Sequence, residues 1–139
     1  MVQSAKAKNL ETNELTFLDS FTNLPSIDFI YSSGALQYTP DPYGFLEQLL
    51  KIDAHSILFN RMMFNEHDRD IVTIQTSLLS ENGHGFMSEK YSDKKVSYPH
   101  TTLSYHKFNL MVSRYYRLVW IFEEASGSHD IKNESIIGR

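Results

Sequence analysis

The sequence predicts an α/β fold with a mostly parallel sheet and helices packed against it. Short runs of β-branched and aromatic residues alternate along the chain with segments of helical periodicity, as is typical of βαβ units. The chain has 139 residues, which is enough for one hydrophobic core and one domain. It has no cysteine, so neither disulfides nor thiolate metal ligands hold it together.

The first quarter of the chain contains one weak and two stronger secondary-structure signals. Residues 3–13 favour a helix by composition, but their apolar stripe is thin, so this helix would need a neighbour to be stable. Leu15–Leu18 is predicted as a short strand that ends at Asp19. Residues 27–33 form the clearest strand, and their nearly continuous apolar character predicts burial on both faces.

An amphipathic helix and a second strand follow. Gly34 permits a sharp turn, and Asp41 before Pro42 is typical of a helix N-terminus. Apolar residues then recur at helical spacing as far as residue 52. Residues 56–60 predict a second buried strand, so the two strands of this strand–helix–strand unit should be parallel.

The second half of the chain begins with a long variable segment, residues 66–101. Within it, residues 71–76 are compatible with a strand, and residues 82–85 have turn chemistry suited to a hairpin or a loop. Regular patterns then return. They predict a helix over residues 104–113 that starts at Ser104, an apolar core strand over 115–122, and a last strand within 131–137.

Charge and composition exclude several function classes. The net charge is −4, from 13 basic and 17 acidic residues, without a basic cluster, which argues against nucleic-acid binding. No apolar run approaches the roughly 20 residues needed to cross a bilayer, and the N-terminus does not resemble a secretory signal. The six histidines lack metal-ligand spacing, so no metal site is expected. We therefore expect a cytoplasmic protein that binds neither nucleic acid nor membranes.

One stretch of the sequence resembles a known family. Phe17-Leu18-Asp19-Ser20, then Asn23-Leu24-Pro25, residues 27–38 and Asp41-Pro42 are similar to the middle of class I, Rossmann-like S-adenosylmethionine-dependent methyltransferases. The resemblance is most specific between Phe17 and Asn60 and weaker in the rest of the chain. It implies a partial Rossmann-like methyltransferase sheet, with S-adenosylmethionine as the cofactor and a small molecule as the methyl acceptor.

The resemblance also implies which residues bind the cofactor. Asp19 occupies the place of an acid that contacts the adenine amino group, and Ser33, Gly34 and Leu36 resemble the segment that lines the cofactor cavity. The alternative for Asp19 is a turn residue that caps a helix, and the alternative for Gly34 is a simple turn glycine.

On the acceptor side, the implied residues are Tyr38 and Arg61. Tyr38, with Gln37, either faces the substrate or begins a loop. Arg61 either holds an anionic group of the acceptor or pairs with Glu66 or Asp70. The sequence assigns no catalytic residue.

The chain also departs from the family. The family has a glycine-rich loop after its first strand and an acid after its second, whereas this chain has no glycine before Gly34. We therefore expect residues 1–139 to be a single truncated methyltransferase-like domain, which an upstream polypeptide could complete. The strand at 27–33 would then have an open edge, so we expect a homo-oligomer, most simply a two-fold dimer. The alternative function is a non-catalytic oligomeric interaction module.

Overall fold

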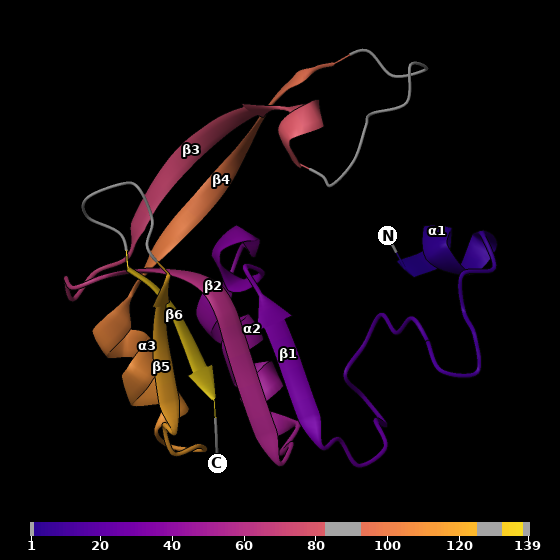
Figure 1. Cartoon of the computed structure of the whole chain (residues 1–139), viewed down its shortest axis with the longest axis horizontal. Coiled ribbons are helices and arrows are strands. Elements are labelled where there is room, and N and C mark those ends of the chain that lie inside the picture. The colour runs from indigo at the N-terminus through magenta and orange to yellow at the C-terminus, as the bar shows by residue number, and fades with distance from the viewer. Residues whose placement is uncertain (1, 83–92, 125–131, 138–139) are drawn as a thin grey trace.

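A computed structural model of the chain describes residues 2–82, 93–124 and 132–137. Six strands in this part of the chain form one mixed sheet (Figure 1). Their bounds are β1 Phe29–Ser33, β2 Ser56–Asn65, β3 Ile71–Leu78, β4 Lys95–Ser104, β5 Trp120–Glu124 and β6 Lys132–Ile137. The order across the sheet is β3-β4-β2-β6-β5, and β1 also pairs with β2.

The predicted α/β class with mostly parallel strands is confirmed. Among the described strands, β1, β2, β4 and β5 run in one direction, whereas β3 and β6 run in the other. β1 and β2 are parallel, as predicted, and their register runs from Phe29 opposite Ser56 to Ser33 opposite Asn60. β4 pairs with β2 only at Phe64 and Asn65. Because β6 lies along the other edge of β2, β1 and β4 follow one another along the same edge.

Three α-helices and two short 3₁₀ helices complete the described part of the fold: α1 Val2–Ala7, η1 Leu36–Tyr38, α2 Pro42–Lys51, η2 Leu79–Asn82 and α3 Tyr105–Val112. The predicted start of α2 is confirmed, because the Asp41 side chain accepts a hydrogen bond from Gly44 N and Pro42 is the first helical residue. The predicted start of α3 is confirmed too, since the Ser104 hydroxyl accepts from Lys107 N.

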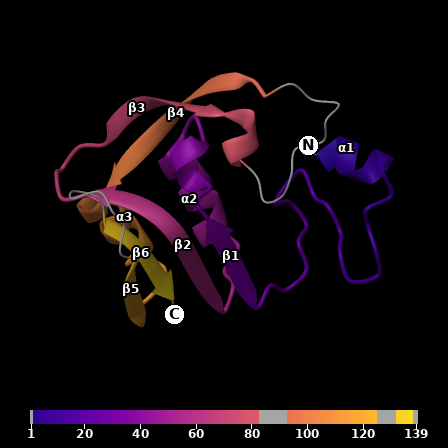
Figure 2. The same cartoon turned by 45° about the horizontal axis from the view of Figure 1, so that its top comes forward.

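The hydrophobic core lies between the sheet and the two longer helices, α2 and α3, which contact each other and cover the same face of the sheet (Figures 1 and 2). β2 buries Ile57, Phe59, Met62 and Phe64 on this face, with the alternation interrupted between Phe59 and Met62. The ring of Phe108 in α3 lies 5.2 Å from the ring of Phe59 and 4.8 Å from that of Phe64, measured between centroids.

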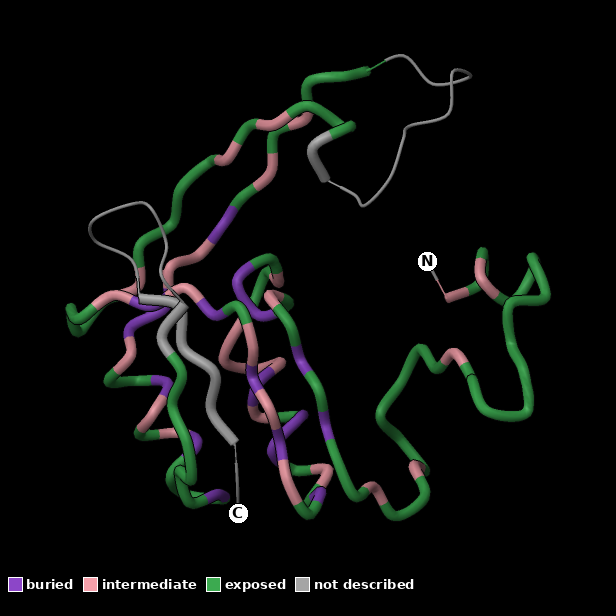
Figure 3. Tube along the Cα trace, in the orientation of Figure 1, coloured by how far each residue is buried: buried purple, intermediate pink, exposed green. Residues whose placement is uncertain are grey.

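Two strands differ from their predicted burial. Residues 27–33 were expected to be covered on both faces, but β1 buries only alternate residues, and Phe29 and Tyr31 are exposed (Figure 3). The strand predicted over residues 115–122 is present only in its last part, and its predicted burial in the core is wrong. β5 starts only at Trp120, and Trp120 and Phe122 are exposed. For β1 the physical reason is that α2 and α3 cover only one face of the sheet. In β5 Ile121 is exposed as well, so its described side chains are not covered on either face.

The helix and the strand predicted for the N-terminal segment are also wrong, because this segment has no neighbouring element to pack on or pair with. The helix predicted over residues 3–13 is limited to Val2–Ala7, which buries no residue. Leu15–Leu18 is not a strand. A strand satisfies its backbone hydrogen bonds through a neighbour, and no described strand lies beside these residues; they run away from the sheet (Figure 1).

The variable segment 66–101 contains an antiparallel hairpin. β3 confirms the predicted strand 71–76 and extends it, and all eight of its residues pair with β4, from Ile71 opposite Thr102 to Leu78 opposite Lys95. Residues 83–85 of the predicted turn lie outside the described residues. No described helix is long and apolar enough to cross a membrane.

Candidate functional site

The candidate site lies at the carboxyl end of β1, the kind of position where open α/β sheets bind ligands. Here the chain turns out of the sheet at Gly34, which has a φ of +57° and donates its N–H to Asn60 O at 2.8 Å. This backbone conformation strains any residue with a Cβ. The predicted turn at Gly34 is therefore confirmed.

An irregularity in β2 places Arg61 beside this turn. The register between β2 and β6 shifts between Phe59 and Met62, and Arg61 has a φ of +55°. Asn60 Oδ1 accepts a hydrogen bond from Arg61 N at 2.9 Å. The Arg61 carbonyl oxygen lies 3.7 Å from the position that a Cβ on Gly34 would occupy. The structure thus brings two predicted site residues, Gly34 and Arg61, into contact range.

The short helix η1 connects this turn to the hairpin. Gln37 Nε2 donates to Arg61 O at 3.3 Å. The ring of Tyr38 lies edge-on to the rings of Tyr98 and His100, with centroids 5.7 and 5.2 Å away, and about half of Tyr38 remains exposed. Tyr38, which was predicted to bind the methyl acceptor, therefore packs between η1 and β4 next to the turn at Gly34.

Three buried polar atoms mark the elements that meet around this turn. Ser32 Oγ on β1, Gln37 Oε1 on η1 and His100 Nε2 on β4 are buried without a hydrogen-bond partner among the described residues. Burial lowers the pKa of His100, so its imidazole is neutral at neutral pH and can accept a hydrogen bond. Buried polar atoms of this kind cost about 1–3 kcal/mol each when unsatisfied, so each of the three atoms is available to bind a water molecule or a ligand group.

Sequence reasoning missed His100, which was grouped with the other scattered histidines. A signal was present: in a strand over residues 95–104, alternation places Tyr98 and His100 on the same face. The signal could be found only after β4 had been recognised as a strand.

An apolar cavity of about 400 Å³ lies beside β1 and α2. Ser33 and Ala35, which flank Gly34, line it from the sheet side, and Leu18 and Ser20, which flank Asp19, line it from the N-terminal segment. The two segments that the sequence links to the cofactor thus line one cavity. In the sequence, 12 residues separate Ser20 from Ser33.

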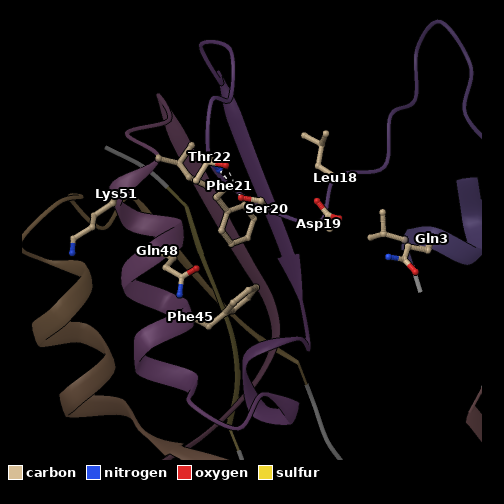
Figure 4. Close-up of a pocket in the computed structure, with 11 residues that line it drawn as sticks. Gln3, Leu18, Asp19, Ser20, Phe21, Thr22, Phe45, Gln48 and Lys51 are labelled. Carbon is tan, nitrogen blue, oxygen red and sulfur yellow. Dashed lines mark hydrogen bonds between the residues drawn. The ribbon is translucent and has the colours of Figure 1, made fainter.

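A wider groove of about 1040 Å³ continues from this cavity, and Asp19 lines it (Figure 4). The rings of Phe21 and Phe45, both in its lining, pack against each other with centroids 5.7 Å apart. Leu18 and Asp19 lie apart from the α2 side chains. Asp19 is exposed, so its carboxylate is accessible to a ligand.

Leu36 does not fit the predicted role in cofactor binding. Its side chain is completely buried in the core cluster, so it packs against the protein rather than lining a ligand surface. Leu36 is apolar because it packs in the core, not because it lines a cavity. Of the four predicted cofactor residues, Asp19, Ser33 and Gly34 remain at or beside the cavity.

The alternative partner predicted for Arg61, Asp70, is engaged elsewhere. Asp70 Oδ1 accepts hydrogen bonds from Tyr43 OH at 2.7 Å and from Ser104 N at 2.8 Å, and Lys107 Nζ lies 3.4 Å from Oδ2. Burial alone would raise the pKa of Asp70, but these hydrogen bonds and the Lys107 charge outweigh it and lower that pKa. Burial, followed by the bond to Asp70, raises the pKa of Tyr43. This cluster joins α2, the start of β3 and the start of α3, so its role is structural.

Within the described residues, no group of three or more potential metal ligands comes together.

Comparison with known proteins identifies the fold. No family model matches the sequence, and no curated protein matches it. Solved structures do match. One is an S-adenosylmethionine-dependent methyltransferase from Clostridium acetobutylicum ATCC 824, with a TM-score of 0.53 and 10% identity over 99% of this chain and 68% of that chain. The N-terminal domain of EvdMO1 in the presence of SAH and D-fucose matches with a TM-score of 0.51 and 12% identity over 86% of this chain.

The chain has part of the fold of S-adenosylmethionine-dependent methyltransferases. A second structure of the EvdMO1 domain, with SAH bound, gives a TM-score of 0.50 at 12% identity over 86% of this chain. The chain spans about half the length of the EvdMO1 domain, since it covers 50% and 49% of those two chains. At these identities the likeness concerns the fold alone, and the resemblance seen in the sequence is confirmed at that level.

Proposed function

We propose that the protein forms part of an S-adenosylmethionine-dependent methyltransferase and that the carboxyl end of β1 binds the cofactor. The observation that carries this proposal is the shared cavity, because it joins the segment around Asp19 to the turn around Gly34. One solved structure of the EvdMO1 domain has SAH bound, and the other was obtained in the presence of SAH and D-fucose. The shared fold supports a similar ligand here.

The described residues fit the adenosyl part of the ligand. The cavity is mainly apolar in its lining, with Leu18, Phe21 and Ile30 among the residues that form it, and an adenine ring favours such surroundings. The accessible Asp19 carboxylate can accept a hydrogen bond from the adenine amino group. The chain has no glycine before Gly34, so we propose that contacts to the amino-acid part come from an additional polypeptide that completes the domain.

Methyl transfer requires mainly that the reacting groups are held in line. When bound, S-adenosylmethionine supplies an activated methyl group to a nucleophilic atom of the acceptor. In this protein, Tyr38 and His100 form the wall next to the turn, and Arg61 can pair with an anionic group of a small-molecule acceptor. Positioning of this kind can lower a barrier by about 7–11 kcal/mol, and it needs no metal.

Isothermal titration of the chain with SAH tests the proposal. We expect saturable binding with a Kd on the order of 100 μM, or about 5.5 kcal/mol, because only part of the ligand would be contacted. Gly34→Val should weaken binding by about tenfold or more, since a β-branched residue is strained at a φ of +57°.

Leu110→Val is the matched control, because Leu110 is exposed on α3, away from the cavity residues, and its replacement should leave the affinity unchanged. The absence of any heat at millimolar SAH would contradict the proposal for this chain.

A further inference from the structure

The segment that precedes β1 passes the apolar cavity without hydrogen bonds to the sheet or the helices. Residues 18–24, which we call the strap, form neither a helix nor a strand. The hydrogen bonds described for them stay within the strap, between Ser20 and Thr22. Among the described residues, backbone bonding to the sheet begins at Ile27, whose carbonyl oxygen accepts from His55 N. A segment with so few bonds changes its conformation at little expense of free energy.

One aromatic contact joins the strap to the body of the protein. The ring of Phe21 packs on that of Phe45 in α2, with the centroids 5.7 Å apart, and both side chains line the cavity and the wider groove. Even so, Phe21 is 40% exposed, and Leu18 at the start of the strap is 55% exposed. The strap therefore has apolar surface left over, and a ligand in the cavity could cover it.

The strap holds Asp19 outside the apolar cavity in this structure. Leu18 and Ser20 line the cavity of about 400 Å³, whereas Asp19 between them lines the wider groove and not the cavity. Figure 4 shows Leu18 and Asp19 set apart from the side chains of α2. A ligand that fills the cavity between β1 and α2 would therefore reach the Asp19 carboxylate only after the strap has moved toward it.

We propose that the strap closes over the adenosyl part of the bound cofactor, with the contact of Phe21 on Phe45 as its fixed point, and so brings the Asp19 carboxylate to the adenine amino group. The inference rests on the proposed cofactor site. Closure covers the exposed side chain of Leu18 with the ligand, which is favourable, and adds a hydrogen bond from the amino group to the carboxylate. The ligand shifts the strap toward the closed form because it binds that form more tightly.

Amide hydrogen exchange of the chain, measured by mass spectrometry with and without about 1 mM SAH, tests the proposal. We expect exchange in residues 18–24 to slow by about tenfold when SAH is bound, while exchange in β3 stays the same. Phe21→Ala should remove most of this protection and weaken SAH binding about fivefold, because the strap loses its fixed point. Phe122→Ala is the matched control, since it truncates the same residue type at an exposed position on β5 and should do neither.

Calorimetry on the same samples separates closure of the strap from binding of the cofactor. SAH that binds while exchange in the strap stays unchanged would overturn closure alone, whereas no heat at millimolar SAH would contradict the proposed cofactor site and closure with it. Asp19→Ala should weaken SAH binding in the wild-type chain but much less in Phe21→Ala, because the carboxylate reaches the ligand only when the strap is closed. Equal effects of Asp19→Ala in the two chains would also overturn the proposal.

Discussion

Replacing Phe108 with alanine is expected to lower the free energy of unfolding by about 3–5 kcal/mol. The Phe108 side chain is completely buried, and its ring contacts those of Phe59 and Phe64. Its removal would leave a cavity between α3 and the centre of β2, which the surrounding side chains can fill only partly. Urea denaturation followed by circular dichroism measures the change.

Leu110→Ala is the control for this prediction. Leu110 lies on the same helix but is exposed, so its truncation should change the free energy of unfolding by less than about 0.5 kcal/mol. Equal effects of the two substitutions would show that α3 does not pack on the sheet as described.

Replacing Asp70 with alanine is expected to lower the free energy of unfolding by about 2–3 kcal/mol at neutral pH. The substitution removes the acceptor for Ser104 N and for Tyr43 OH, and Ser104 is buried at the start of α3. Asp68→Ala is the control, because Asp68 is an exposed acid in the same segment and its loss should have little effect.

The loss of unfolding free energy caused by Asp70→Ala should also depend on pH. Hydrogen bonds lower the pKa of Asp70 in the folded state, so its stabilising effect is present above the ordinary aspartate pKa of about 4. It is lost as the pH falls through the lowered value. The difference between wild type and Asp70→Ala should therefore be full at pH 7 and shrink below about pH 4. A difference that stays constant over this range would contradict the assigned hydrogen bonds.

The local parts of the fold could be predicted from the sequence because their signals are local. Asp41 and Pro42 fix the start of α2, Ser104 fixes that of α3, and Gly34 fixes the turn after β1. Burial could not be predicted in the same way. Tyr31 and Trp120 have the composition of core residues, and whether such residues are buried depends on what covers that face of the sheet, which the local sequence does not specify.

The same distinction applies to the candidate site. Gly34 was predicted from its place after β1, and Arg61 from its place after the strand predicted over residues 56–60. Although β2 continues to Asn65, the structure brings the two residues together. Leu36 was misassigned because an apolar residue after a strand suits a core as well as a cavity. His100 was missed because β4 follows a long segment with weak patterns, and only the hairpin register with β3 places it beside η1.

Amide chemical shifts measured during a titration with SAH would test the central claim, that the carboxyl end of β1 forms the cofactor site. We predict that the shifts which change on addition of SAH belong to residues around the shared cavity, including Gly34, Ser33 and Asp19, while the amides of β3 stay unchanged. A titration that leaves Gly34 and its neighbours unperturbed, or that moves only residues of the hairpin, would contradict this assignment.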